Sequence, residues 1–190
     1  MRLLVFLHGT TLMHPGAAGR SRAERVSHVR DGTDPTVHDF AAYVPVGDAV
    51  AKLRHWQERG VEIAYLSSHR DPEGVANDGR VLRRHGFPPG EILARTAGES
   101  YGEVAARALP DVLVEDDCES IGGLGEVTYP QIPARLRARI RSIVVPEFGG
   151  IGHLPDSLDE LQSLAARRFS RRAPSRSHAA RRTACSRGGG

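Results

Sequence analysis

The sequence has very little cysteine, a single lysine and no long hydrophobic segment. Two cysteines among 190 residues, Cys118 and Cys185, argue against a disulfide framework and against a zinc site. No apolar run approaches the ~20 residues that span a bilayer, so no membrane partner is expected. The apolar start, MRLLVFLHG, is too short for the hydrophobic region of a signal peptide and has no small-residue cleavage site. We therefore expect a cytoplasmic protein whose first strand is buried.

Acidic residues are absent after Glu160. Eight of the 26 basic residues lie at or after Arg167, which leaves 18 basic against 23 acidic residues, a net charge of −5, in residues 1–166. The overall charge of +3 therefore comes from residues 167–190 and says nothing about a ligand of the remaining chain. The Arg, Ser, Ala and Gly composition of 167–190 predicts a disordered tail. Nonspecific contact of this tail with nucleic acid is the alternative; nucleic acid is otherwise not expected as a partner.

Apolar segments alternate with helical patterns along residues 1–166. The run Leu3–Leu7 stops at a polar loop, which is typical of a central parallel strand covered on both faces. Further strands are predicted over 61–66, 91–94, 111–115 and 142–145, and helices over 21–30, 46–60, 71–86, 101–109, 135–141 and 155–166. This alternation predicts one α/β domain with a three-layer, doubly wound parallel sheet of the Rossmann type. Residues 11–44 are expected to form at most a small cap or flap.

Two helix starts carry clear local signals. Ser21 is followed three residues later by Glu24, the pattern of a capping box. Asp71 precedes Pro72, the order of an N-cap residue followed by proline at the first helical position. Both helices should therefore begin where these residues lie.

Three polar segments each follow the end of an apolar strand: His8-Gly9-Thr10, Ser67-Ser68-His69-Arg70 and Asp116-Asp117. In open α/β sheets, ligands bind at the carboxyl ends of the strands, where the strand order reverses. Hydroxyls, carboxylates, an imidazole and free backbone amides together suit a phosphate group and a metal ion. The sequence therefore predicts that His8, Ser67 and Asp116 lie in one crevice.

These segments, in this order, resemble motifs of the haloacid dehalogenase-like (HAD) hydrolases over about residues 1–150. LLVFLHGTT resembles the first motif, a strand followed by DxDGT; YLSSHR resembles the second, a strand ending in Ser or Thr; and VLVEDDCES resembles the fourth, a strand ending in paired acids. The resemblance implies a phosphatase-type hydrolase acting on a phosphorylated small molecule. It further implies phosphate binding by Gly9, Thr10, Ser67 and Ser68, and Mg²⁺ binding by Asp116 and Asp117.

The first motif departs from the family pattern. Aligning Gly9-Thr10 with the Gly-Thr of the motif puts Phe6 at the nucleophile position and His8 at the acid/base position. Phenylalanine cannot attack phosphorus, whereas histidine, with an unperturbed pKa near ~6.5, can transfer a proton. The resemblance therefore implies a binding site in which catalysis by His8, Asp116 and Asp117 is altered or lost. A noncatalytic ligand-binding or regulatory protein on the same fold, a pseudoenzyme, is the alternative.

The cation of the third HAD motif also has no obvious counterpart. Lys52 is the only lysine and lies too early in the chain, so Arg95 or Arg107 would have to replace it.

Structural roles compete with these functional ones. His8 can be a structural histidine bonded in a turn, and Ser67 and Ser68 can cap the helix that begins after Asp71. The adjacent carboxylates of Asp116 and Asp117 repel each other unless a cation or backbone amides stabilise them, which favours a ligand role.

Two further expectations concern polar residues outside these motifs. Glu115 alternates to the other side of its strand and is expected to be a surface charge. Four histidines, at positions 14, 28, 38 and 153, have no spacing that is typical of a metal motif.

Truncation of the chain after Ala166 should leave the melting temperature nearly unchanged, because residues 167–190 contain no apolar periodicity and no counter-charge. Calorimetry of the full and truncated chains checks this. A large decrease in melting temperature would mean that the arginines pack on the acidic body.

Overall fold

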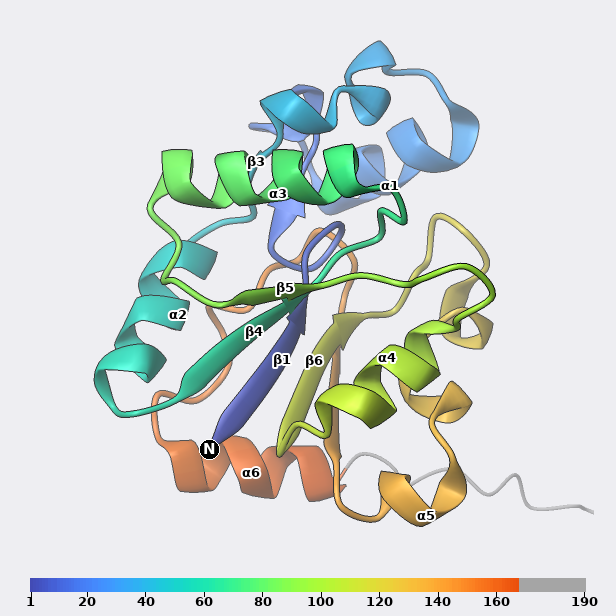
Figure 1. Ribbon diagram of the computed structural model, residues 1–190. Helices are drawn as coiled ribbons and strands as arrows, with labels where there is room; N and C mark the ends of the chain where they lie inside the picture. Colours follow the sequence, from blue (N-terminus) through green and yellow to red (C-terminus); the bar gives the residue numbers. More distant parts are fainter. Residues whose placement is uncertain (168–190) are drawn as a thin grey trace, which may run out of the picture.

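Five parallel strands form the central sheet of the computed structural model, which describes residues 1–167, and the backbone alone for 165–167 (Figure 1). The expectation for the tail after Arg167 lies outside the described residues. The strand order is β5-β4-β1-β6-β7. The strands are β1 (Arg2–Phe6), β4 (Glu62–Leu66), β5 (Glu91–Leu93), β6 (Val112–Asp116) and β7 (Arg141–Val145). The predicted parallel sheet is confirmed.

Strand β1 is covered on both faces, which explains its continuous apolar sequence. Leu3 and Val5 pack into one core cluster, and Leu4 packs into the other. The first cluster includes side chains of α2 (Ala49–Glu58), α3 (Pro72–His85) and α6 (Leu158–Arg167). The second includes side chains of α4 (Tyr101–Ala108) and α5 (Ala134–Arg137). Helices therefore cover both faces, and the predicted three-layer architecture is confirmed.

The helix starts follow the local signals in the sequence. Helix α1 (Arg22–Asp31) begins with a complete capping box between Ser21 and Glu24. Helix α3 begins at Asp71, whose carboxylate accepts a hydrogen bond of 2.6 Å from the Gly74 amide. Helix α5 is shorter than predicted, because the chain after it buries Ile140 and enters β7 at Arg141.

The strand order reverses at β1, and this fixes where a ligand can bind. From β1 the chain builds β4 and β5 on one side, then crosses to β6 and β7 on the other. The carboxyl ends of β4, β1 and β6 therefore meet at the switch point of the sheet, the usual ligand position in such folds.

A thirty-residue insertion, residues 14–43, lies at this end of the sheet (Figure 1). It connects β2 (Leu12–Met13) and β3 (Val44–Pro45), which pair antiparallel. It contains α1 and the 3-10 helices η1 (Pro15–Ala17), η2 (Pro35–His38) and η3 (Phe40–Ala42). Two side chains of the insertion, Ala17 and Val26, belong to a small core. The other members are Met13 of β2, Val46 after β3 and Phe148 in the loop after β7.

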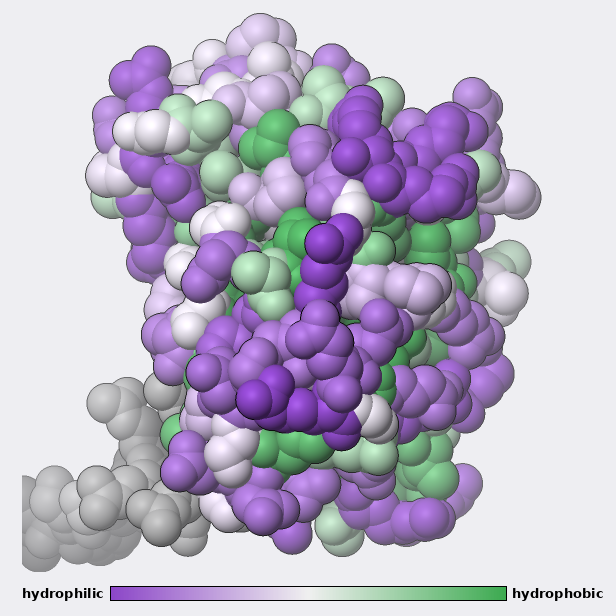
Figure 2. Space-filling view, turned by 90° about the vertical axis from the view of Figure 1, so that its left-hand side faces the viewer, coloured by the Kyte–Doolittle hydropathy of each residue, from purple (hydrophilic) through white to green (hydrophobic). Residues whose placement is uncertain are grey.

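One face of the molecule, the left-hand side of Figure 1, is mostly polar. Figure 2 shows mainly hydrophilic side chains on this face, with hydrophobic ones in the recesses between them. Within residues 1–167, no helix combines the length and the apolar character needed to cross a membrane.

Candidate functional site

A pocket of about 620 Å³ lies at the carboxyl ends of β1, β4 and β6. The insertion contributes one wall of it, and the loops after the strands contribute the rest. The residues that line the pocket include Phe6, His8, Gly9, Val29, Val37, Phe40, Tyr43, Ser68, Arg70, Arg95, Tyr101, Glu115, Asp116, Cys118, Ser120 and Glu147. His8 and Asp116 thus share one crevice, as predicted, whereas Ser67 lies behind its lining.

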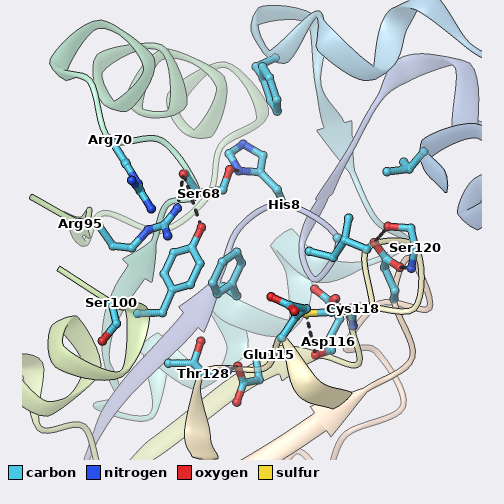
Figure 3. A pocket seen from close by; sticks show the side chains of 18 of the residues that line it. His8, Ser68, Arg70, Arg95, Ser100, Glu115, Asp116, Cys118, Ser120 and Thr128 are labelled. Carbon is cyan, nitrogen blue, oxygen red and sulfur yellow. Dashed lines mark hydrogen bonds between the residues drawn. The ribbon is translucent and has the colours of Figure 1, made fainter. Parts of the chain in front are cut away.

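The polar groups of the pocket are divided by charge. In Figure 3, Arg70 and Arg95 lie with Ser68 on one side, Glu115 and Asp116 lie on the other, and His8 lies between the two sides. A ligand in this pocket therefore meets Arg70 and Arg95 at one end, where Glu99 also belongs to the lining, and Glu115 and Asp116 at the other.

His8 bridges a pocket hydroxyl and a buried carboxylate. Its Nδ1 is 2.6 Å from Ser68 Oγ, and its Nε2 is 3.2 Å from Asp78 Oδ1. Asp78 is only 1% exposed, within α3, and was not anticipated from the sequence. Its place on the inner side of α3, among apolar residues, was the available signal. His8 therefore contacts a loop and a helix far along the chain and is not bonded only within its own turn.

The two serines after β4 differ in what they contact. Ser67 is fully buried, donates to Asp78 Oδ2 at 2.5 Å and accepts from the His69 amide at 3.0 Å. Ser68 lines the pocket. Of the pair predicted to bind phosphate, Ser68 faces the ligand space, while Ser67 orients the carboxylate behind His8. Neither caps α3, whose N-cap is Asp71.

Of the two arginines considered for the third motif, Arg95 reaches the pocket. Its guanidinium carbon lies 3.7 Å from the centre of the Tyr101 ring, and its Nη2 is 3.4 Å from the Ser68 carbonyl oxygen. Its Nε is buried and has no hydrogen-bond partner among the described residues. Arg107 does not line the pocket and pairs with Glu99 at 3.2 Å.

Asp116 is linked directly to the loop after β1. Its Oδ2 accepts a 2.7 Å hydrogen bond from Thr10 Oγ1, and its Oδ1 accepts one of 3.0 Å from the Cys118 amide. A Cβ atom at Gly9 would lie 2.7 Å from Asp116 Oδ2, and Gly9 has a φ of +87°. Because the Gly9 amide donates to the Leu12 carbonyl, Gly9 contributes space and not a free donor. Thr10, predicted to bind phosphate, is fully buried and binds Asp116.

Three carboxylates can together bind a divalent cation. Asp116, Asp117 and Glu147 each offer an oxygen, and these oxygens lie within 4.8 Å of one another. Burial is the main cause that raises the pKa of Asp116 and of Glu147, and the neighbouring carboxylates raise both further. A cation would stabilise their charged forms, and oxygen ligands suit Mg²⁺. The residues present therefore fit this ion.

Glu147 is a site residue that the sequence reasoning missed. It follows β7 as Asp117 follows β6, so the same end-of-strand rule applied to Pro146-Glu147 would have found it. Its carboxylate accepts hydrogen bonds of 2.7 Å from both the amide and the hydroxyl of Ser120.

The prediction that Glu115 is a surface charge is wrong. Because β6 is covered on both faces, the side opposite Asp116 is also interior, and Glu115 is only 2% exposed. It accepts hydrogen bonds from the amides of Thr128 (2.6 Å) and Tyr129 (3.0 Å). Burial nevertheless raises the pKa of Glu115 to about 7.

No family model matches this sequence, and no curated protein is similar to it. Among solved structures, the class C acid phosphatase from Bacillus anthracis with tungstate bound is similar, with a TM-score of 0.50 and 16% identity over 91% of this chain and 79% of that chain. A HAD family hydrolase from Deinococcus radiodurans R1 with bound phosphate and sodium gives a TM-score of 0.41 and 13% identity over 86% and 87%. The fold is HAD-like, as the motifs implied. At this identity the similarity shows the fold alone.

Glu115 should make the protein less stable as the pH rises from about 4.5 to about 7. In this window the unfolded chain has released the proton that the folded state keeps, because the pKa of folded Glu115 is raised to about 7. The free energy of unfolding should fall by on the order of 3 kcal/mol from this group. Denaturation of wild type and Glu115→Gln across this range measures it: the variant should lack this fall, while the exposed Glu58→Gln should follow the wild-type curve. Parallel curves for wild type and Glu115→Gln would contradict the assignment.

Proposed function

We propose that this chain binds a phosphorylated small molecule in the pocket, with its phosphate between the arginines and a Mg²⁺ ion at the carboxylates. The observation that carries the proposal is the separation of charge across one pocket, with Arg70 and Arg95 on one side and Glu115 and Asp116 on the other. A phosphate bound next to Mg²⁺ satisfies both sides at once.

The cationic side supports an anionic ligand. Stacking on Tyr101 orients the Arg95 guanidinium, and a stacked, pre-oriented guanidinium suits the oxygens of a phosphate. The buried Nε of Arg95 has no partner among the described residues, and buried polar groups are normally hydrogen-bonded. Ser68 adds a hydroxyl beside it. The unpartnered Nε of Arg95 favours an anionic ligand beside it.

The acidic side supports a cation of modest affinity. Mg²⁺ dehydrates reluctantly and is usually bound by one or two carboxylates together with phosphate oxygens of the substrate. Asp116 and Asp117 would hold the ion here, with Glu147 beside them. The ion would neutralise charge on the phosphate. Since Phe6 supplies no carboxylate from β1, binding without a phosphorylated ligand should be weak.

The rest of the ligand meets an apolar wall. Val29, Val37, Phe40 and Tyr43 of the insertion line the pocket on this side. Apolar and aromatic linings with a few polar anchors are typical of small-molecule sites. The insertion would thus act as the cap that was expected over residues 11–44, and the ligand would carry an apolar or aromatic group beside its phosphate.

Phe6 favours a binding role without the usual chemistry. It lines the pocket and packs edge-on against Tyr101 with ring centres 5.0 Å apart. An aspartyl-phosphate cannot form there, because phenylalanine has no lone pair to attack phosphorus. The position of Phe6 therefore favours a noncatalytic ligand-binding or regulatory protein.

A second candidate function is hydrolysis that depends on His8. His8 lies between Ser68 Oγ and Asp78 Oδ1, which is an arrangement that orients an imidazole as a general base. His8 Nδ1 would accept the proton of the Ser68 hydroxyl, and the Ser68 oxygen would accept a proton from water in the pocket. Asp116 and Asp117 would then serve by holding the metal ion.

Mg²⁺ should bind weakly alone and more tightly with a phosphomonoester present. The double mutant Asp116→Asn, Asp117→Asn should abolish this binding, because it lacks the charged ligands. Titration calorimetry measures the affinity, with the exposed Asp159→Asn as the matched control. Identical metal binding in wild type and the double mutant, with phosphate present, would rule out the site.

Arg95→Gln should weaken phosphomonoester binding at least ~10-fold, because it removes a charge-assisted contact. Titration calorimetry also measures this affinity.

The wild type should form no aspartyl-phosphate, whereas Phe6→Asp, His8→Asp should gain phosphomonoesterase activity with Mg²⁺. The double substitution introduces the two carboxylates that the HAD-like motif lacks here. The groups proposed to bind phosphate and Mg²⁺ are left unchanged. The two proteins are assayed on a panel of phosphomonoesters, and His8→Asn reports whether any wild-type turnover depends on His8. Robust wild-type turnover with a trapped aspartyl-phosphate would place the nucleophile elsewhere.

A further inference from the structure

A cluster of two histidines and one aspartate lies inside the insertion and does not line the pocket. His14 follows β2, His28 lies in α1, and Asp34 is the N-cap residue of η2. Their spacing in the sequence has no metal-motif pattern, because the three come from separate elements. The fold nevertheless brings one donor atom of each within 4.8 Å of the other two.

The distances in this cluster fit ligands that share an ion. His14 Nε2 is 3.3 Å from His28 Nδ1, and His28 Nδ1 is 3.5 Å from Asp34 Oδ2. Two ligands at zinc–nitrogen distances of 2.0–2.1 Å in a tetrahedral site lie about 3.3 Å apart. The spacing of these donor atoms is therefore compatible with their binding one metal ion.

His14 is placed so that one ring nitrogen faces the other two residues of the cluster. Its side chain is fully buried. Its Nδ1 is buried without a hydrogen-bond partner among the described residues, which leaves Nε2 as its one polar contact atom. That atom points at His28.

Asp34 is held so that one oxygen faces the histidines. Its Oδ1 accepts hydrogen bonds from the amide (2.9 Å) and the hydroxyl (2.6 Å) of Thr36. The Thr36 hydroxyl in turn accepts from the Gly16 amide at 3.1 Å. A Cβ atom at Gly16 would lie 1.8 Å from Asp34 Oδ2, so only glycine leaves room there. Carboxylates that bind metals are commonly positioned by such outer hydrogen bonds.

Few side chains of the insertion are buried within its helices: α1 buries only Val26, and η2 buries only Val37. The contacts that hold α1 to the body include hydrogen bonds from Arg22 and Arg25 to the carbonyls of Glu147 and Phe148. A metal ion at the cluster would add a direct link between α1 and η2.

We propose that His14, His28 and Asp34 bind a Zn²⁺ ion that crosslinks the end of β2, α1 and η2. The side chains of His28 and Asp34 are 20% and 17% exposed, so water reaches the cluster and supplies the fourth ligand. By fixing α1 against η2, the ion sets the positions of Val29 and Val37 in the pocket wall. This inference does not depend on the proposed function.

The test uses the full chain, stripped with EDTA and then titrated with ZnCl₂. Calorimetry and elemental analysis should show one zinc ion per chain, and the melting temperature should rise when zinc is added. His28→Gln and Asp34→Asn should each reduce the zinc content to near none and abolish the rise. Asp34→Asn separates metal binding from structure better than His28→Gln does, because an asparagine oxygen can still accept the hydrogen bonds from Thr36.

The matched control is His69→Gln, because His8, His69 and Asp78 form another group of donors within 4.8 Å of one another. Zinc retained by His69→Gln and lost by Asp34→Asn supports the proposal. Zinc retained by Asp34→Asn and lost by His69→Gln overturns it and puts the ion beside the pocket. If the variants do not fold, the wild type alone still tests the proposal. A zinc content well below one ion per chain, with a melting temperature that zinc does not change, also overturns the proposal.

Discussion

The parallel pairing of β1 with β4 on one side and β6 on the other is the constraint on which the site depends. This pairing buries β1 on both faces and brings the loops after all three strands to one place. The 2.7 Å hydrogen bond from Thr10 to Asp116 then ties the first loop to the fourth-motif acids, and Gly9 leaves the space that this contact needs. The cationic side follows from the same arrangement, because Ser68 and Arg95 leave β4 and β5 on the opposite side of β1.

The residue at the nucleophile position takes part in this arrangement. Phe6 packs edge-on against Tyr101, and the other contact of the Tyr101 ring is the Arg95 guanidinium, 3.7 Å from its centre. The side chain that removes the nucleophile therefore also supports the platform that orients a pocket cation. A carboxylate at this position would instead add a third charge beside Asp116, whose pKa burial already raises. An apolar residue is thus compatible with a pocket that binds an anion without attacking it.

The sequence was sufficient for the sheet and for the position of the site, and insufficient for the direction of individual side chains. Continuous apolar strands and the signals at Ser21 and Asp71 are local features, so they could be recognised without knowing the contacts. The different positions of Ser67, which is buried, and Ser68, which lines the pocket, depend on what packs against each strand end, and so does the burial of Glu115. Asp78 and Glu147 come from elements whose approach only the tertiary fold determines. The spacing of the histidines at 14 and 28 in the sequence does not indicate that they lie close together, because only the tertiary fold brings them near each other.

The way the insertion is attached places the apolar wall and the charged groups of the pocket on different parts of the chain. The chain enters through Met13 and leaves through Val44, which are paired neighbours in β2 and β3, so the two ends of the segment are held about 5 Å apart. A segment anchored at adjacent points can change in length or sequence while the sheet beneath it keeps its register. Because Val29, Val37 and Phe40 come from this segment and the charged groups of the pocket come from the strand ends and their loops, the apolar wall can diverge while these charged groups stay fixed. Among descendants of such a chain, the range of ligands could broaden or switch at little cost to foldability, and a designer could exchange the same segment as a cassette.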